Sequence, residues 1–451
     1  MTESVLEQLT QLVGAENILT GDQIGMDYAH DEYPAEKEYY PEAVCIAHST
    51  AAVAEIVKYC NENGIALTPR GAGTGQAGGS VPVSGGIVLS LKEMNQILSL
   101  DEENRRMTVE AGVLLQDVKA EAEAHGLYYP PDPGEKTATI GGNVSTNAAG
   151  PCAGKYGRTE NYVLDAVFVT GEGRIVRISE LPDGKAVIGA EGTVGILTEI
   201  TLKLIEKPAA DVILLFPFAD AETCISAAKK IQAAGYDAAI MEYLDTDIVE
   251  YSGNITGNPV FPVELDGDRV ESTLVVSLEG SGEEDLENAM ENIAEYAEEL
   301  ECLDILVVDT PNMKRDLWAA YDAFHTSVET AKAHMEYNID LPSDRVPEMV
   351  SFAKALAGEK GISVMAYAHL MSGNLHLHAV AEMSKADFSE IEPVLASAVY
   401  GKCVELGGSI TGEYGIGYAK MQYLSGTDII ARKAKKASFD PSGILNPGKL
   451  F

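Results

Sequence analysis

The sequence predicts an α+β protein with more than one domain, and three observations support this fold class. The chain has 451 residues, which exceeds what one hydrophobic core usually serves, so two or three domains are expected. Segments with the apolar alternation of strands occur at RRMTVEAGV, AVFVTGEGRIVRI and ILTEITLKLIE. Of two segments rich in Gly and small polar residues, 68–80 (TPRGAGTGQAGGS) precedes these strands and 139–150 (TIGGNVSTNAAG) separates the first from the second.

The first elements can be placed from local signals. Apolar residues at helical spacing predict a helix over 50–63, with Ser49 or Thr50 as its N-cap and Gly64 as its end. The sequence IALTPRG then predicts a strand that leads into the first Gly-rich segment. A helix followed by a strand at this point is consistent with the α+β class.

The two Gly-rich segments predict a site for a large anionic ligand. Gly permits the positive φ values that gather backbone N–H groups into a concavity, which holds a pyrophosphate without a side chain in the way. Gly73, Gly75 and Gly78 also fit the Rossmann fingerprint, but that interpretation requires a helix directly afterwards. The strand-like sequence SVPVSGGIVLSL follows instead. The pattern therefore favours a flavin dinucleotide over a Rossmann site or a structural turn without a ligand.

Four motifs then identify a family. The sequences PRGAGTGQAGG, PPDPGEKTATIGGNVSTNAAG, KYGRTENYVLDAVFV and GAEGTVGILTEITLKL resemble the FAD domain of the FAD-linked oxidases related to glycolate oxidase and D-lactate dehydrogenase. That family has the vanillyl alcohol oxidase type of fold, and the C-terminal NPGK (446–449) extends the resemblance over nearly the whole chain. The predicted domains are an FAD-binding domain at 1–208, a cap or substrate domain at 209–403, and a segment at 404–451 that returns to the FAD domain.

The resemblance implies a set of residues around FAD. The first segment has neither the His nor the Cys used for covalent attachment, so the flavin is expected to be held by contacts alone. The expected cofactor-binding residues are Pro69, Arg70, Gly71, Ala72, Gly73, Thr74, Gly75, Gln76, Gly79, Pro133, Gly134, Thr139, Gly141, Gly142, Asn143, Thr146, Asn147, Gly150, Tyr156, Gly157, Glu191, Gly192, Gly195, Ile196 and Asn446.

The cap domain is expected to place helices on a mostly antiparallel sheet. Helical patterns at 221–235 and 283–301 alternate with strand-like TLVVSLEG and DILVVD. A further helix is expected over 314–336, which carries the only Trp, and a basic helix over 431–440.

A histidine cluster predicts a metal site. SVMAYAHLMSGNLHLHAV reads as two strands joined by a four-residue loop, and pairing of Leu370 with Leu375 would set His369 opposite His376 on one face. His378 would lie on the same face. Glu413, between glycines, offers a third ligand, and the resemblance implies that His369, His376 and Glu413 bind one divalent ion, Zn, Fe or Mn. Stacked histidines bonded to backbone carbonyls remain the alternative.

The expected reaction is removal of hydride from an alcohol carbon to the flavin, with the metal lowering the pKa of the hydroxyl. Two departures from the family stand in the catalytic region. Tyr414 follows Glu413 where relatives have a His base, and His378 stands where they usually carry Asn, so either is a candidate base. Tyr321 and Glu336 stand where relatives hold a substrate carboxylate with Arg and Lys, and His325 lies one helical turn after Tyr321.

Composition restricts the partners. The chain has 32 basic and 70 acidic residues, a net charge of −38 that repels nucleic acid and anionic lipid surfaces. The N-terminus lacks a secretory signal pattern and no stretch approaches about 18 apolar residues, so a cytoplasmic protein without a membrane span is expected. Six scattered Cys without CxxC spacing argue against an iron–sulfur cluster within the chain.

The electrons of the reaction therefore need an external acceptor. An electron-transferring flavoprotein, an iron–sulfur subunit or oxygen would serve, and a homo-oligomer is left open. The main expectation is a metal-assisted dehydrogenase of a hydroxyl-bearing small molecule, and two alternatives to it remain. One is an ordinary D-lactate or glycolate dehydrogenase that anchors its carboxylate by other means. The other is a non-catalytic flavoprotein subunit that only relays electrons.

Overall fold

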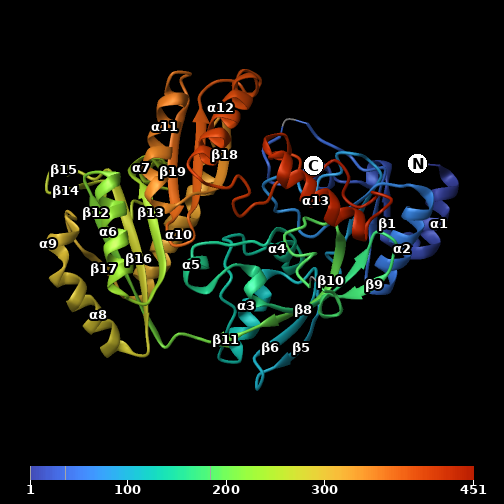
Figure 1. Ribbon diagram of the computed structural model, residues 1–451, viewed down its shortest axis with the longest axis horizontal. Helices are drawn as coiled ribbons and strands as arrows, with labels where there is room; N and C mark the ends of the chain where they lie inside the picture. The colour runs from blue at the N-terminus through green and yellow to red at the C-terminus, as the bar shows by residue number, and fades with distance from the viewer. Residues whose placement is uncertain (1, 36, 183, 451) are drawn as a thin grey trace. The chain divides into compact units, whose positions relative to one another are not determined.

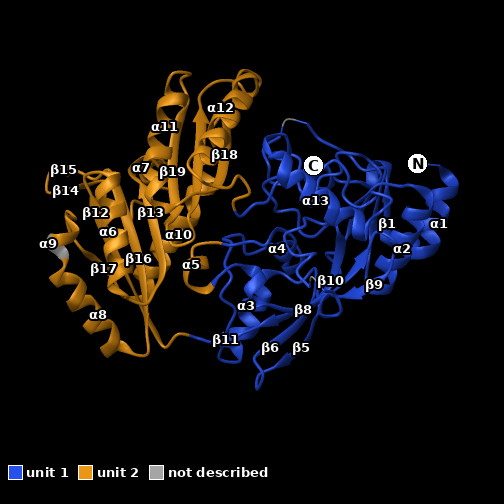
Figure 2. Ribbon diagram, viewed as in Figure 1, with its two compact units in different colours: residues 1–149, 157–207, 413–451 blue, residues 150–156, 208–412 orange. Residues whose placement is uncertain are grey.

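The structure, a computed structural model, describes residues 2–35, 37–182 and 184–450 and divides the chain into two compact units (Figure 2). Unit 1 comprises Met1–Ala149, Gly157–Lys207 and Glu413–Phe451, and unit 2 comprises Gly150–Tyr156 and Pro208–Gly412. The short segment Gly150–Tyr156 thus belongs to unit 2 although unit 1 flanks it on both sides in the sequence.

Unit 1 contains two main sheets with strand orders β1-β2-β4-β3 and β5-β6-β10-β8-β9, and a small β11-β7 pair (Figure 1). The strands are β1 (Ile18–Thr20), β2 (Ala43–Ile46), β3 (Leu67–Arg70), β4 (Ile87–Ser90), β5 (Ile97–Asp101), β6 (Arg106–Glu110), β7 (Leu127–Tyr128), β8 (Val163–Thr170), β9 (Ile175–Arg177), β10 (Gly195–Lys203) and β11 (Ile205–Glu206). In the first sheet β2, β4 and β3 are parallel, whereas the second sheet is antiparallel. This mixture, with the unit's helices, confirms the α+β class.

The helices of unit 1 are α1 (Glu3–Val13), α2 (Thr50–Asn63), α3 (Leu115–Ala124), α4 (Ile140–Thr146) and α13 (Gly426–Phe439). The sequence prediction for α2 is confirmed: the Ser49 side chain accepts a hydrogen bond from the amide of Ala52, and Gly64 ends the helix at φ +61°. The C-terminal basic helix begins at Gly426, before the expected 431, because Ser425 caps it.

The two Gly-rich segments adopt different structures. The first leaves β3 and reaches β4 without a helix, which excludes the Rossmann interpretation. The second was expected to be a loop throughout, but its first half forms α4. The Thr139 side chain accepts a hydrogen bond from the amide of Gly142 and caps this helix, and Asn147 ends it in the left-handed region. A cap at one end and a left-handed residue at the other explain why so glycine-rich a sequence forms about two turns of helix.

Unit 2 contains a seven-stranded sheet of order β17-β12-β16-β13-β19-β20-β18, in which every neighbouring pair is antiparallel. Its strands are β12 (Ala210–Phe218), β13 (Ala238–Asp245), β16 (Ser272–Gly280), β17 (Leu306–Val308), β18 (Ala333–Asp340), β19 (Ser363–His369) and β20 (Asn374–Ala381), with a separate hairpin of β14 (Glu264–Leu265) and β15 (Asp268–Arg269). Its helices are α5 (Ala153–Tyr156), α6 (Ala221–Ala234), α7 (Thr246–Thr256), α8 (Glu283–Glu295), α9 (Ala297–Leu300), α10 (Pro311–Val328), α11 (Val346–Gly358) and α12 (Lys385–Glu405). The predicted antiparallel sheet with helices is confirmed.

One face of this sheet is covered by α7 and α10. Their apolar side chains form a cluster with Leu244 of β13, Met365 and Tyr367 of β19, and Val380 of β20. Side chains two residues apart in a strand point to the same face. Glu242, His369 and His378 each lie two residues from Leu244, Tyr367 or Val380. Their side chains therefore point to this same face, toward α7 and α10.

The helix expected over 314–336 is wrong at its C-terminal end. α10 stops at Val328, and β18 follows, where every residue from Ala333 to Asp340 pairs with β20. Buried and half-buried residues alternate at the start of β18, a strand pattern that outweighs helix propensity once β20 offers a partner. Glu336 therefore lies on a strand, whereas Tyr321 and His325 lie on α10. The expected helix 283–301 is also divided, into α8 and α9 at Tyr296.

The register expected for the histidine hairpin is wrong by two residues. Tyr367, not His369, is the cross-strand partner of His376, and His369 pairs with Asn374. Gly373, at φ +77°, donates its amide to the carbonyl oxygen of His369 at 2.9 Å and closes the hairpin earlier than expected. Because the shift is an even number of residues, His369 and His376 stay on the same face as diagonal neighbours.

Candidate active site

The first Gly-rich segment and α4 meet in unit 1. A Cβ atom added at Gly71 would lie 2.2 Å from Oγ1 of Thr139, so only Gly allows this approach of the backbone. At Gly73, with φ +85°, an added Cβ would fall 2.0 Å from the guanidinium of Arg70. Gly141 of α4 is packed against Ala111 in the same way, at 2.8 Å. The structure therefore brings the two predicted walls of the cofactor site together in one unit.

A second group of predicted residues is joined by hydrogen bonds. The Asn446 amide donates to the carbonyl oxygens of Gly79, at 2.8 Å, and Glu191, at 2.7 Å. The Glu191 carboxylate accepts the backbone N–H groups of Ile416 and Gly417 at 2.8 and 2.7 Å. The C-terminal segment thus returns to the first Gly-rich segment through Asn446, and Glu191 connects both to β10.

The predicted residues fit a bound dinucleotide. Asn143 is buried in α4, and among the residues that the structure describes its Nδ2 has no hydrogen-bond partner. A donor buried without an acceptor is unfavourable, so a ligand oxygen at this position accounts for it. The close Gly packing and the unsatisfied amide are what a nest for a phosphate-bearing ligand requires.

Two ionisable residues of unit 1 escaped the sequence analysis. Lys449 is buried, and burial lowers its pKa to about 7 even though Asp31 and Glu191 lie nearby. Burial likewise raises the pKa of Asp31 to about 7, against the effects of the Tyr33 amide and Arg70. The NPGK motif was a signal for Lys449, whereas nothing in the sequence around Asp31 marks it.

Most predicted cofactor residues lie in unit 1, but two do not. Gly150 and Tyr156 belong to the inserted segment of unit 2, where the Tyr156 hydroxyl donates to the carboxylate of Glu279. Cys152 of the same segment packs against Ala239 and Ile240 of β13. These residues are therefore held by the sheet of unit 2.

The two histidines of the predicted metal site face each other in unit 2. Nε2 of His369 and Nε2 of His376 are 3.3 Å apart, and both residues are buried. Nδ1 of His369 lies 2.8 Å from Oε2 of Glu242 on β13, and Nδ1 of His376 lies 2.7 Å from Oε1 of Glu336 on β18. Each imidazole is thus oriented by a buried carboxylate through its outer nitrogen.

The carboxylates favour one tautomer of each ring. A carboxylate accepts a hydrogen bond from Nδ1–H, and a neutral ring in this tautomer carries its lone pair on Nε2, facing the other ring. Asn338 also approaches this ring: its Nδ2 is 3.3 Å from both nitrogens of His376 and donates to Asn374 at 2.8 Å. Two lone pairs 3.3 Å apart repel unless a cation lies between them. Tetrahedral Zn with bonds of about 2.0–2.1 Å places ligand nitrogens about 3.3–3.4 Å apart.

Tyr321 supports the same group from α10. Its hydroxyl donates to Oε2 of Glu242 at 2.7 Å, the oxygen that also accepts from His369. Glu242 is fully buried, and these two donors satisfy one of its oxygens. Tyr321, predicted as a catalytic residue, is therefore placed behind the histidine pair. The sequence analysis missed Glu242, although an acidic residue within the buried strand AAIMEYLD was a signal for it.

The third predicted ligand, Glu413, is buried and is the first residue of the last segment of unit 1. Gly412, the last residue of unit 2, approaches Asn338 so closely that an added Cβ would lie 2.0 Å from its Oδ1. The peptide bond keeps Cα of Glu413 about 3.8 Å from Cα of Gly412 however the two units are arranged. Gly412, the residue at which unit 2 ends, therefore lies beside the strand that carries Asn338 and Glu336.

The remaining candidates, His325 and His378, lie in unit 2. Burial lowers the pKa of His378 to about 3, against the attraction of Glu336, so the ring is neutral at neutral pH. For His325, burial lowers the pKa, but hydrogen bonds to Glu329 and Glu336 outweigh it and raise the pKa to about 10. Burial raises and the neighbouring histidines lower the pKa of Glu336, which ends well below its ordinary value. Glu336 thus accepts from histidines rather than standing as a free charge toward a substrate.

Comparison with known proteins identifies the family. Residues 41–179 match the FAD binding domain, and residues 207–450 match the C-terminal domain of FAD linked oxidases. The chain belongs to the FAD-linked oxidases. It carries the FAD-binding domain and is an FAD-linked oxidoreductase.

Two relatives extend along the whole chain. A D-lactate dehydrogenase of Anaerostipes hadrus is 37% identical over 100% of this chain and 98% of the relative. The glycolate oxidase subunit GlcD of Bacillus subtilis is 33% identical over 100% of this chain and 97% of the relative. Among solved structures, p-cresol methylhydroxylase matches with a TM-score of 0.79 at 17% identity. The match covers 100% of this chain and 97% of the p-cresol methylhydroxylase chain. The vanillyl alcohol oxidase type of fold is therefore confirmed. Among the described residues, no helix combines the length and apolar character needed to cross a membrane.

Proposed function

We propose that this FAD-linked oxidoreductase oxidises a 2-hydroxy acid or a related alcohol, with one divalent cation held by His369, His376 and Glu413. The observation that carries the proposal is the buried pair of Nε2 atoms 3.3 Å apart, with both outer nitrogens on carboxylates. Carboxylate partners of this kind set the tautomer and raise the basicity of metal-binding histidines. An electron relay without chemistry has no use for such a pair.

The residues of the chain have distinct roles in this proposal. Glu242 and Glu336 orient His369 and His376, and Tyr321 holds Glu242 in place. A divalent cation supplies Lewis-acid chemistry, which lowers the pKa of a hydroxyl group bound to it. Imidazole and carboxylate ligands together suit Zn, Fe or Mn.

A proton acceptor is needed for the substrate hydroxyl. Since burial lowers the pKa of His378 to about 3, this ring is a weak proton acceptor at neutral pH. Tyr414, which follows the proposed ligand Glu413 directly in the chain, is the stronger candidate for this role. In its phenolate form this side chain would take the proton while the histidine pair keeps its orientation.

FAD supplies the hydride acceptor. We propose that it is bound without a covalent link by the residues predicted around Gly71–Gln76, Gly141–Asn143, Glu191 and Asn446, since no His or Cys occurs in the first Gly-rich segment. The names of the two relatives, for D-lactate and glycolate, support a 2-hydroxy acid as the substrate class. The Bacillus relative is named as a subunit, which supports an electron-accepting partner protein such as an electron-transferring flavoprotein or an iron–sulfur subunit.

Anaerobic bleaching of the bound flavin tests the proposal. The purified protein is mixed without oxygen with a panel of D- and L-2-hydroxy acids and with neutral alcohols of the same carbon skeleton. We expect at least one hydroxy acid or alcohol to reduce the flavin within one turnover, and His376→Ala to abolish that reduction. Retention of full metal content and full activity by His376→Ala contradicts the assigned ligands.

A further inference from the structure

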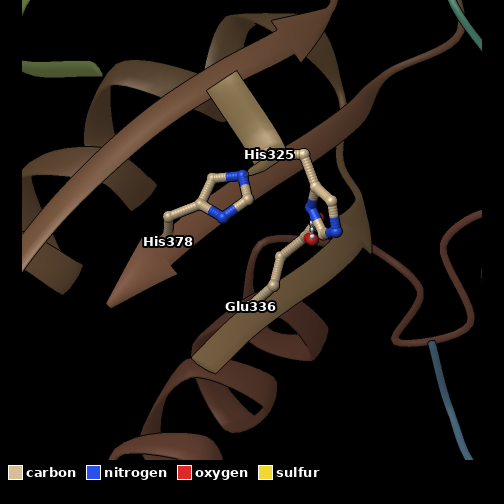
Figure 3. Close-up of side chains that lie close together, drawn as sticks. All are labelled: His325, Glu336 and His378. Carbon is tan, nitrogen blue, oxygen red and sulfur yellow. Dashed lines mark ion pairs between the residues drawn. The ribbon is translucent and has the colours of Figure 1, made fainter. Parts of the chain in front are cut away.

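A second group of potential metal ligands lies in unit 2. His325 on α10, Glu336 on β18 and His378 on β20 each offer one ligand atom, and these atoms all lie within 4.8 Å of one another. Figure 3 shows the three side chains converging from the helix and the two strands. None of these three residues belongs to the histidine pair formed by His369 and His376.

The sheet register creates this group. Glu336 and His378 are direct cross-strand partners, so their side chains leave the sheet side by side on the face that α10 covers. His325 reaches down from α10, and its Nδ1 lies 3.4 Å from Oε2 of Glu336. A ligand pair at this separation fits one ion with bonds of about 2.1 Å and a tetrahedral angle.

A buried polar atom without a partner in this group is an independent observation that supports a ligand. His378 is 1% exposed, and among the described residues its Nε2 has no hydrogen-bond partner. Nearly all buried polar atoms are satisfied in native structures, so this nitrogen requires an explanation. An ion held between His378, Glu336 and His325 supplies it.

His325 is prepared for metal binding in the same way as the first pair. Its Nε2 lies 3.3 Å from Oε1 of Glu329, one turn further along the chain, which leaves Nδ1 directed at Glu336. The carboxylate on the outer nitrogen reproduces the pattern of His369 with Glu242 and of His376 with Glu336. Three histidines with three carboxylate partners, two on the sheet and one on α10, form a repeated arrangement.

We propose that His325, Glu336 and His378 hold a second divalent cation beside the first. Glu336 connects the two sites, because its Oε1 accepts from His376 while its Oε2 faces His325. Ligands of a tetrahedral ion with bonds of about 2.1 Å lie about 3.4 Å apart, so side-chain movements of about 1–1.5 Å close the group around an ion. The adjoining first site rests on the proposed function, whereas the ligands of the second site do not depend on it.

Charge compensation favours two cations over one. Glu242, Glu329 and Glu336 surround the histidines, and the proposed ligand Glu413 adds a fourth carboxylate. Two divalent cations balance four carboxylates, whereas one leaves two negative charges in a largely buried region. A proton on His325 is the competing occupant, since the carboxylates of Glu329 and Glu336 flank that ring.

Metal stoichiometry distinguishes the two occupants. FAD-loaded protein is incubated with excess Zn²⁺, separated from free metal, and analysed for zinc per flavin by mass spectrometry. We expect two zinc ions per flavin in the unmodified protein, one in His378→Asn, one in His369→Ala, and two in His334→Ala. His334 lies on β18 outside both groups and is the matched control for removal of an imidazole.

Other zinc counts distinguish failure of the second site from failure of the first site. One zinc ion in the unmodified protein that is lost in His369→Ala but kept in His378→Asn overturns the second site and leaves the first intact. One ion lost in His378→Asn but kept in His369→Ala supports the second site and overturns the first. If His378→Asn fails to retain flavin, His325→Gln replaces it with the same expectation of one ion, and two ions in that variant overturn the proposal.

Discussion

Replacement of Glu242 by Gln tests how the histidine pair is oriented. Glu242 is 0% exposed, and one of its oxygens accepts both the His369 Nδ1 proton at 2.8 Å and the Tyr321 hydroxyl at 2.7 Å. Gln has the same size but carries no charge, so the bond to His369 loses its charge-assisted character. A hydrogen bond to a charged group contributes about 1.5–3 kcal/mol, and about 1.4 kcal/mol corresponds to a tenfold change in affinity.

The expected result of Glu242→Gln is therefore Zn²⁺ binding about 10- to 100-fold weaker at the first site, the range known for outer partners of metal-binding residues. The affinity is measured on FAD-loaded protein by competition with a chromophoric chelator. Tyr321→Phe is the matched control, because it removes one donor to Glu242 and keeps the contact between the carboxylate and His369. The reasoning is refuted if Glu242→Gln binds Zn²⁺ within twofold of the unmodified protein, or if Tyr321→Phe weakens binding more than Glu242→Gln does.

Three further predictions concern stability and cofactor binding. Lys354 lies 2.6 Å from both Asp245 and Asp247, and burial raises the pKa of Asp245 against the effect of Lys354. A raised pKa of Asp245 means that the folded state binds more protons than the unfolded state, so ionised Asp245 is unfavourable without its partner Lys354. Lys354→Met should therefore lower the free energy of unfolding by about 1–3 kcal/mol at pH 8, with a smaller loss as the pH falls toward 5 and Asp245 takes up a proton. A loss that does not depend on pH counts against this. Acid precipitation should release all of the FAD into the supernatant, and flavin remaining on the polypeptide contradicts non-covalent binding. Gly71→Ala should lower the ratio of flavin to protein because its Cβ meets Thr139, whereas Gly401→Ala, with open space around it, should not; equal flavin content in both disagrees with the cradle.

Local signals in the sequence predicted those elements whose ends are determined by neighbouring residues. Ser49 and Gly64 determine both ends of α2, and the absence of a helix after the first Gly-rich segment followed from the strand-like sequence there. The histidine pair could also be predicted, because its members lie in one hairpin. The error in register did no harm to that prediction, since a shift of two residues keeps side chains on the same face.

Elements determined by distant partners could not be predicted in this way. Residues 333–336 continue a helical pattern, and only pairing with β20 makes them a strand. The same pairing turns Glu336 from an apparent substrate-facing residue into a partner of His376. Glu242 lies 127 residues before His369 in the chain, so the contact between them depends on the pairing of β13 with β19. Fold class and cofactor thus follow from local motifs, while the carboxylates around the histidines depend on sheet order.

The rate of anaerobic flavin reduction with and without metal tests the central claim most directly. The protein is stripped of metal, its FAD content is verified, and flavin reduction by the best hydroxy acid of the panel is followed before and after reloading with Zn²⁺ or Mn²⁺. Lewis-acid activation contributes several kcal/mol, so reloading should raise the rate at least about 100-fold, and His376→Ala should not respond to reloading. Equal rates in stripped and reloaded protein would contradict the assignment of His369, His376 and Glu413 as a catalytic metal site.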